Sequence, residues 1–362
     1  MNDVGELKQY VLIHARAQGM PAAHCQDVLD RIHTDDDGPG SWAHEWLAAG
    51  ERHESAGNLL DACRDYGLAR FPFTGTELRS EAARRGVAAF DRWRAGNSAI
   101  QPLTVDLPTG PLRCLATGLD ENRPLLLVMG GIVSVKEQWA QVLLNAPKLG
   151  MAVVVAEMPG VGENTSVYRA DSWQQISGLI DALAGRADVS QSYALSLSFS
   201  GHLLLRCALH DSRVKGIVTS GAPIHDFFTD ADWLTGQVPR ITLDTLSHLM
   251  AVKTETLAEN LAGWELTPAE LSALRIPVHY LVSRRDEIIP PAEPVLLRRH
   301  VADLRLAEHD DVHGSPDHFA ESRLWIAHSL LRMRDVRGPQ RAALAVMLGL
   351  ARARAKLRGS SR

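Results

Sequence analysis

Cysteine is scarce in this sequence, and its spacing excludes the sites that cysteine usually builds. The four cysteines, Cys25, Cys63, Cys114 and Cys207, are scattered through 362 residues, and no two of them form a C-x-x-C pair. This spacing fits neither a zinc site of paired cysteines nor a dense disulfide framework. We expect four reduced, buried thiols, which suit a reducing cytosol and favour a cytoplasmic protein.

The sequence also lacks a long apolar run and a strong net charge. No apolar stretch approaches the ~20 residues that a membrane-spanning helix needs. The first residues do not combine a basic region with an apolar stretch, so we expect no secretory signal. The net charge is −5 at pH 7, so no overall electrostatic attraction to nucleic acid is expected. We therefore expect neither a membrane nor a nucleic acid as a partner.

A repeat of fixed period is absent as well, which excludes a helical solenoid. Residues 1–98 nevertheless have a helical pattern, with apolar residues at helical spacing and Ser41 as a candidate cap of one helix. We predict a helical N-terminal cap region over these residues. Its histidines lack metal-ligand spacing along the chain, so we interpret them as surface or core residues. These histidines are His14, His24, His33, His44 and His53.

From residue 99 the pattern changes to alternating strands and helices. Two short runs around a Pro-Thr-Gly turn at 108–110 indicate a hairpin. Continuous apolar runs at 125–129 and 152–156 are typical of strands that are covered on both faces. Helical stretches separate the later strands. This order predicts an α/β fold over residues 99–335, with a mainly parallel sheet flanked by helices.

Two segments fall outside the alternation. Between residues 223 and 275 the pattern predicts several short helices, and we expect this insertion to cover the carboxyl edge of the sheet as a lid. Residues 336–362 are predicted to form a separate basic helix and tail. A solvated helix whose cations offset its own dipole is the plain interpretation, and an anionic partner site is the alternative. The basic residues are Arg352, Arg354, Lys356 and Arg358.

The stretch from Tyr193 to His202 is the strongest local signal in the chain. Its first half is apolar and strand-like, small residues follow, and a helical pattern comes next. A serine raised on such a strand–turn–helix is the nucleophile-elbow arrangement, usually written G-x-S-x-G. Here serines stand in place of the glycines, at Ser196 and Ser200. Ser198 is the candidate nucleophile, and the two neighbouring serines compete with it.

Two later loops carry the base and the acid that a serine nucleophile needs. A serine hydroxyl is a poor nucleophile until a base removes its proton, and His313 is the candidate base. Asp286 would hold the imidazole tautomer and stabilise the imidazolium. Alternatively, Asp286 caps a following helix, or the base is His309 or His318. We prefer His313 because it lies in the middle of its loop beside a glycine.

An oxyanion requires two preorganised N–H donors. The backbone N–H of Phe199 follows the nucleophile, and that of Ile132 follows a glycine pair at 130–131, which is otherwise only a tight turn. Aromatic residues in the lid are candidates for an apolar pocket wall. Packing of the lid against the core explains them equally well. The predicted pocket residues are Gly131, Phe227, Phe228, Trp233 and Trp264.

With these residues in the order serine, aspartate, histidine, the chain resembles the α/β-hydrolase superfamily. More narrowly, it resembles the FrsA-like hydrolases, a group that includes 2,6-dihydroxypseudooxynicotine hydrolase and fungal pigment C–C hydrolases. This resemblance covers roughly residues 40–332 and depends on the stretches 69–73, 124–132 and 159–162. Besides the missing glycines, the chain departs from these relatives at Glu157, where an aspartate is common, and we expect that glutamate to be structural.

The resemblance implies a pocket between the sheet edge, the N-terminal helices and the lid. It implies no metal or organic cofactor, and relatives are often homodimers. Members hydrolyse esters or cleave carbon–carbon bonds next to a ketone in aromatic or polyketide-like substrates. We therefore expect a serine-dependent hydrolase of a hydrophobic small-molecule ester, thioester or activated C–C bond. A cyclase or lyase on the same scaffold and a non-catalytic protein-binding member are the alternatives.

Overall fold

A computed structural model describes residues 2–359, without the side chains of residues 146, 147 and 354–359. Within this part of the chain, eight strands form one sheet in the order β1-β2-β4-β3-β5-β6-β7-β8. β1 and β2 form the predicted antiparallel hairpin, β2 pairs antiparallel with β4, and the remaining neighbours are parallel. The predicted α/β fold is confirmed. The strands are β1 (Gln101–Leu107), β2 (Gly110–Thr117), β3 (Pro124–Met129), β4 (Ala152–Ala156), β5 (Asp188–Leu197), β6 (Val214–Ser220), β7 (Val278–Ser283) and β8 (Leu304–His309).

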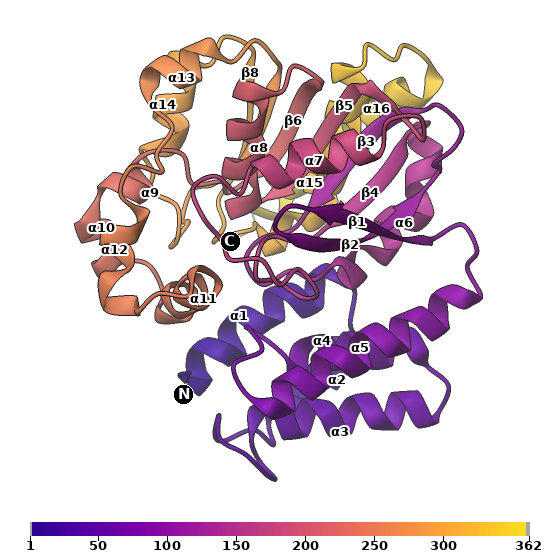
Figure 1. Cartoon of the computed structure of the whole chain (residues 1–362), viewed down its shortest axis with the longest axis vertical. Helices are drawn as coiled ribbons and strands as arrows, with labels where there is room; N and C mark the ends of the chain where they lie inside the picture. Colours follow the sequence, from indigo (N-terminus) through magenta and orange to yellow (C-terminus); the bar gives the residue numbers. More distant parts are fainter. Residues whose placement is uncertain (1, 360–362) are drawn as a thin grey trace.

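Helices cover both faces of the sheet, and each face has its own hydrophobic core (Figure 1). Successive strand residues point to opposite faces. Leu127 therefore packs with the helices α7 and α8 and with the lid, whereas Leu126 packs with α15 and with the N-terminal helices. This division explains the continuous apolar runs in the sequence. The helices beside the sheet are α6 (Ala140–Asn145), α7 (Gln174–Ala182), α8 (Phe199–His210), α14 (Glu293–His300) and α15 (Phe319–Met333), with short 3-10 turns η1 (Lys136–Trp139), η2 (Ala146–Leu149) and η4 (Pro316–His318).

The N-terminal region is helical and packs below the sheet in the view of Figure 1. Ser41 is the N-cap residue of α3, as predicted, but its side chain makes no capping hydrogen bond. The chain divides α3 from α4 at Gly57, whose φ of 79° is incompatible with a right-handed helix. The helices are α1 (Val4–Ala17), α2 (Ala22–Leu29), α3 (Trp42–Ser55), α4 (Leu59–Ala69) and α5 (Glu77–Ala95).

Short helices occupy the segment between β6 and β7, where the sequence predicts an insertion. Figure 1 shows one of them, α11, beside α1, and hydrogen bonds connect these two helices: the Glu6 carboxylate of α1 accepts from the backbone N–H groups of Arg240 (3.2 Å) and Ile241 (2.8 Å). This carboxylate offsets the positive end of the α11 dipole. The helices are α9 (Asp226–Thr229), α10 (Ala231–Gly236), α11 (Arg240–Met250), η3 (Thr254–Thr256), α12 (Leu257–Leu261) and α13 (Pro268–Ala273).

The last helix, α16 (Pro339–Gly359), packs against α15. Leu348 is buried, and Arg352 donates to the Glu321 carboxylate at 2.9 Å. The other predicted basic residues, Arg354, Lys356 and Arg358, lie outside the described side chains. None of the described helices is both long enough and apolar enough to cross a membrane. The four cysteines are free and buried, as predicted.

Candidate active site

The elbow serine makes the turn between β5 and α8 by itself. Ser198 has φ 56° and ψ −132°, a conformation that costs energy in an L-residue and recurs at functional sites. Its N–H donates to Ser220 O at 2.7 Å, and its carbonyl accepts from Gly201 N at 2.8 Å. The first bond ties the turn to the end of β6, and the second closes the first turn of α8. Because the positive φ falls on Ser198 itself, the flanking positions need only small side chains.

The two competing serines are held inside the fold. Ser196 is fully buried, and its hydroxyl has no hydrogen-bond partner among the described residues. Ser200 is also fully buried. Its hydroxyl accepts from Leu197 N at 3.0 Å and lies 2.9 Å from the carbonyl oxygen of Met129, to which it can donate. Ser200 therefore ties the elbow to β3, and Ser198 is the partly exposed serine of the three.

The structure brings Ser198, His313 and Asp286 into one chain of hydrogen bonds. His313 Nε2 lies 3.1 Å from Ser198 Oγ. The Nδ1 of the same ring lies 2.9 Å from both carboxylate oxygens of Asp286. The Asp286 carboxylate also accepts from the backbone N–H groups of Ile288 (3.0 Å) and Ile289 (2.9 Å), so it caps the chain after β7 and orients the imidazole at once.

Charges around the imidazole set its affinity for a proton. Burial by itself would lower the pKa of His313, but the Asp286 carboxylate, through its charge and its hydrogen bond, and the charge of Glu287 raise that pKa above 6.5. Glu287 also accepts from the backbone N–H of His313 at 3.0 Å. The site therefore stabilises the imidazolium that forms when a serine gives up its proton.

Gly221, which follows β6, was not singled out by the sequence. It has φ 57°, and a Cβ at this position would meet His313 Cε1 at 2.7 Å. A side chain there would displace the imidazole from its place between Ser198 and Asp286. A glycine directly after a buried strand is the only local signal, and it does not distinguish this role from an ordinary turn.

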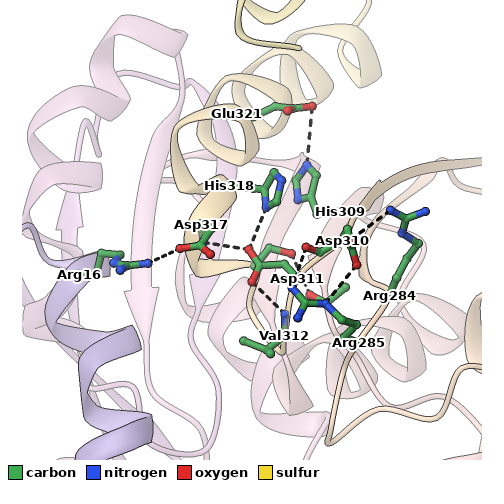
Figure 2. Close-up of polar contacts among 12 residues, drawn as sticks. Arg16, Arg284, Arg285, His309, Asp310, Asp311, Val312, Asp317, His318 and Glu321 are labelled. Atoms are coloured by element: carbon green, nitrogen blue, oxygen red, sulfur yellow. Dashed lines mark hydrogen bonds and ion pairs between the residues drawn. The ribbon is translucent and has the colours of Figure 1, made fainter. Parts of the chain in front are cut away.

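The two other histidines of this loop form a separate cluster, which Figure 2 shows. His318 Nδ1 lies 2.8 Å from Asp311 Oδ2, and the His318 ring stacks on His309 with centroids 4.4 Å apart. His318 ends the short 3-10 turn η4, directly before α15. Burial and His318 lower the pKa of His309. Neither ring is hydrogen-bonded to a serine among the described residues, so the structure brings His313 alone to Ser198.

The predicted oxyanion donors flank the nucleophile. A Cβ on Gly131 would meet Ser198 Cβ at 3.0 Å, so the glycine turn after β3 lies against the elbow. Phe199 is the first residue of α8, where a helix has free N–H groups. In the hydrogen bonds of residues 2–359, neither Phe199 N nor Ile132 N donates to another residue. Both N–H groups are therefore free to donate to a bound oxyanion.

The predicted aromatic pocket residues divide into two groups. Trp233 is partly exposed, donates through Nε1 to Ile288 O at 2.9 Å, and lines a cavity of about 100 Å³ together with Gly221 and Asp286. The other aromatic side chains are buried against one another or against the core. Phe227 packs edge-on against Phe199. The buried residues are Phe227, Phe228 and Trp264. Their contacts match the packing alternative.

Two polar side chains of helix α1 are coupled electrostatically to residues of the triad loops, and no sequence pattern selects them. Burial and the Glu287 carboxylate raise the pKa of Tyr10. Burial, Arg70 and His313 lower the pKa of His14 to about 4, so His14 is neutral at pH 7. Because these residues precede the elbow by more than 180 positions, only the tertiary fold reveals them.

Two buried glutamates hold the loops around the site. Glu293 at the start of α14 accepts from the N–H groups of Ile224 (2.9 Å) and Phe227 (3.1 Å), which fixes the first turn of the lid segment. Glu157 after β4 accepts from the N–H groups of Lys136 and Glu163, both at 3.0 Å. The structural role expected of Glu157 fits these bonds.

Comparisons with known proteins agree with this geometry. A family model described as "Esterase FrsA-like" matches residues 39–309. The chain is 23% identical over 249 residues to Esterase FrsA of Vibrio vulnificus (strain YJ016), a match that covers 63% of this chain and 60% of that protein. It thus aligns with less than two thirds of that relative. With Esterase FrsA of Vibrio parahaemolyticus serotype O3:K6 the identity is 23% over 322 residues, 77% of each chain.

Two solved structures share the fold over most of the chain. AbyA5 superposes with a TM-score of 0.93 at 52% identity, covering 96% of this chain and 99% of that one. The 2,6-dihydroxy-pseudo-oxynicotine hydrolase superposes with a TM-score of 0.71 at 18% identity, covering 88% of this chain and 94% of that one. Both have the helical N-terminal region and the α/β-hydrolase sheet in common with this chain.

Proposed function

The chain belongs to the FrsA-like esterase family of α/β-hydrolases, and from this premise we propose that it is a serine hydrolase with Ser198 as nucleophile. His313 is the general base and Asp286 orients it. The observation that carries the proposal is the unbroken contact chain from Ser198 Oγ through both ring nitrogens of His313 to the Asp286 carboxylate. Because Asp286 holds Nδ1–H, the Nε2 lone pair faces the serine hydroxyl.

In the first half of the reaction, Ser198 Oγ attacks the substrate carbonyl carbon while its proton passes to His313 Nε2. The carbonyl π electrons move to oxygen, and the N–H groups of Phe199 and Ile132 donate to the resulting oxyanion. When the tetrahedral intermediate collapses, His313 returns the proton to the leaving group. An acyl group then remains on Ser198.

In the second half, water takes the place of the serine hydroxyl. His313 removes a proton from water as the water oxygen attacks the acyl carbon, and the second tetrahedral intermediate collapses with release of a carboxylic acid. The proton on His313 returns to Ser198 Oγ. The enzyme is thereby restored. The net reaction breaks the bond between the substrate's carbonyl carbon and the leaving group, together with one O–H bond of water.

We propose a hydrophobic small-molecule ester or thioester, or a C–C bond next to a carbonyl, as the substrate. Trp233 in the cavity wall and the apolar lid support an aromatic or polyketide-like acyl group. C–C cleavage by the same residues requires a leaving carbanion that a second carbonyl stabilises as an enolate, which His313 then protonates. We further propose a cytoplasmic location, which the four free, buried cysteines support.

The test is steady-state hydrolysis of three matched probes that carry one aryl acyl group, as a p-nitrophenyl ester, a thioester and a 1,3-diketone. We expect turnover of at least one probe by wild type and by Ser196→Ala, and loss of about 10⁴-fold or more in Ser198→Ala. The probe that is turned over identifies the bond class. Equal rates in wild type and Ser198→Ala would overturn the serine mechanism, and no turnover of any probe would favour the protein-binding or lyase alternative.

A further inference from the structure

Three side chains from three different helices meet within the N-terminal region. His24 lies on α2, His53 on α3 and Asp65 on α4. His24 Nε2 is 2.8 Å from Asp65 Oδ1, and His53 Nδ1 is 2.8 Å from Asp65 Oδ2. One ligand atom from each residue falls within 4.8 Å of the other two. Spacing along the chain did not predict this cluster, because each residue comes from a separate helix.

The burial of Asp65 makes the cluster more than a chance surface contact. Its carboxylate is completely buried, and the two imidazoles are its only side-chain hydrogen-bond partners among the described residues. An ionised carboxylate without solvent requires a compensating positive charge. The surroundings of Asp65 thus favour a bound cation, whether a proton on His24 or a metal ion.

Two imidazole nitrogens and a carboxylate oxygen form a donor set for divalent transition-metal ions. Tetrahedral Zn²⁺ at 2.0–2.1 Å from its ligands places those ligands about 3.4 Å apart, so the widest pair here has at most about 1.4 Å to close. The His24 and His53 side chains are 24% and 29% exposed, which gives an ion access from solvent and leaves room for a water ligand.

We propose that His24, His53 and Asp65 form a binding site for one divalent transition-metal ion, with Zn²⁺ as the test ion. On binding, His24 Nε2 and His53 Nδ1 turn lone pairs toward the ion, so each neutral ring carries its proton on the other nitrogen. A His24 that was imidazolium releases one proton to solvent. The ion cross-links α2, α3 and α4, and it stabilises the helical region that holds α1 over the triad.

The experiment is calorimetric titration of untagged, chelator-treated full-length protein with Zn²⁺ alone at pH 7.5. We expect one ion per chain in wild type. His24→Gln and His53→Gln should each weaken the affinity for Zn²⁺ by about 10–100-fold or more. Loss of only the outer hydrogen bond of a metal ligand already costs that much. His33→Gln, an exposed histidine of the same region, is the matched control and should bind as wild type. Equal affinity in wild type and both ligand variants would overturn the proposal, as would the absence of saturable binding in wild type.

Two further readouts separate a metal site from a proton-bound cluster. Co²⁺ in place of Zn²⁺ should give visible absorption bands in wild type and in His33→Gln, and these bands should be lost in His53→Gln. Zn²⁺ should raise the Tm of wild type, and the rise should disappear in a folded Asp65→Asn variant and as the pH falls below about 6.5, where protons compete for the imidazoles. Ester hydrolysis should be unchanged by the metal. A Zn²⁺-induced rise in Tm that persists in His53→Gln would place the ion elsewhere and contradict the proposal.

Discussion

Two histidine–aspartate pairs lie in the loops that follow β7 and β8. They differ in the contact that the histidine ring makes besides its aspartate. His313 Nδ1 lies 2.9 Å from Asp286, and His318 Nδ1 lies 2.8 Å from Asp311. The Nε2 of His313 reaches Ser198 Oγ, whereas the His318 ring stacks on His309 (Figure 2). A His–Asp contact alone therefore does not make a general base; its orientation toward a nucleophile does.

The two carboxylates also shape the chain in the same way. Asp286 accepts from the backbone N–H groups two and three residues ahead, and Asp311 accepts from those of Val312 and Asp317, both at 2.9 Å. Each aspartate is thus a loop cap. Asp286 differs from Asp311 because it also holds an imidazole against the elbow serine. Matched substitutions in both histidine–aspartate pairs test this distinction.

The largest expected contrast is between the two histidines. In His313→Gln, kcat/KM for a responsive ester should fall by about 10⁴- to 10⁶-fold, because no base remains for Ser198. In His318→Gln it should stay within a few-fold of wild type. Steady-state hydrolysis of the same ester by both variants measures the contrast. A large loss in His318→Gln, with a small loss in His313→Gln, would reverse the assignment of the two pairs.

The two aspartates should separate activity from stability. Asp286→Asn should lower kcat by about 10⁴-fold, because an amide favours the wrong imidazole tautomer. Asp311→Asn should keep its activity but lower the free energy of unfolding by about 1–3 kcal/mol. Its two carboxylate oxygens accept from Val312 N on one side and from Asp317 N and His318 Nδ1 on the other, and the amide keeps only one of these oxygens and places an NH2 donor where the other was. Urea unfolding and ester hydrolysis, carried out on both variants, give the two quantities. The comparison fails if Asp286→Asn is as active as Asp311→Asn.

Gly221→Ala tests whether the position of the His313 ring matters in itself. The new Cβ would lie 2.7 Å from His313 Cε1, and a displacement of about 1 Å costs roughly 10²-fold in rate. Gly57→Ala is the matched control, since Gly57 also has a positive φ, of 79°, but has no atom within 4 Å of the added Cβ. Both variants carry the backbone strain, and only Gly221→Ala should lose activity. Similar rates in both would mean that the ring is not confined as described.

The smallest expected effect is on pH dependence. The base form of His313 is neutral, and its pKa is raised above 6.5, so kcat/KM should rise with pH through that raised value. A raised folded-state pKa also stabilises the fold below pH 6.5, and this contribution is lost as the pH rises through the folded-state pKa. Glu287→Gln should move the inflection to lower pH. An inflection that stays in place would show that Glu287 does not influence the base.

How far the sequence predicts this site depends on how local each signal is. The elbow at Ser198 and the loops of Asp286 and His313 directly follow strands, so alternation and chain order are enough to select them. Gly221 also follows a strand and Glu293 begins a helix, but these positions do not reveal their roles, because each residue acts on a segment that is distant in sequence. Ser41 occupies the predicted cap position but makes no side-chain hydrogen bond there, so the residue type before a helix does not decide what its side chain contacts.

The N-terminal region shows the same limit more strongly. Periodicity predicts helices there, but it does not reveal that the charge of His313 contributes to lowering the pKa of His14 or that Glu6 accepts hydrogen bonds from the end of α11. From their spacing along the chain we interpreted His24 and His53 as surface or core residues. Such spacing does not reveal that side chains from three packed helices meet at Asp65. Side chains that meet through tertiary packing require the structure.

Labelling with a fluorophosphonate, followed by peptide mass spectrometry, tests most directly whether His313 activates Ser198. Wild type, Ser196→Ala and His318→Gln should be modified at Ser198 at similar rates. His313→Gln should react far more slowly, and Ser198→Ala should not be labelled. Modification of Ser196 or Ser200, or equal labelling rates in His313→Gln and His318→Gln, would contradict the account.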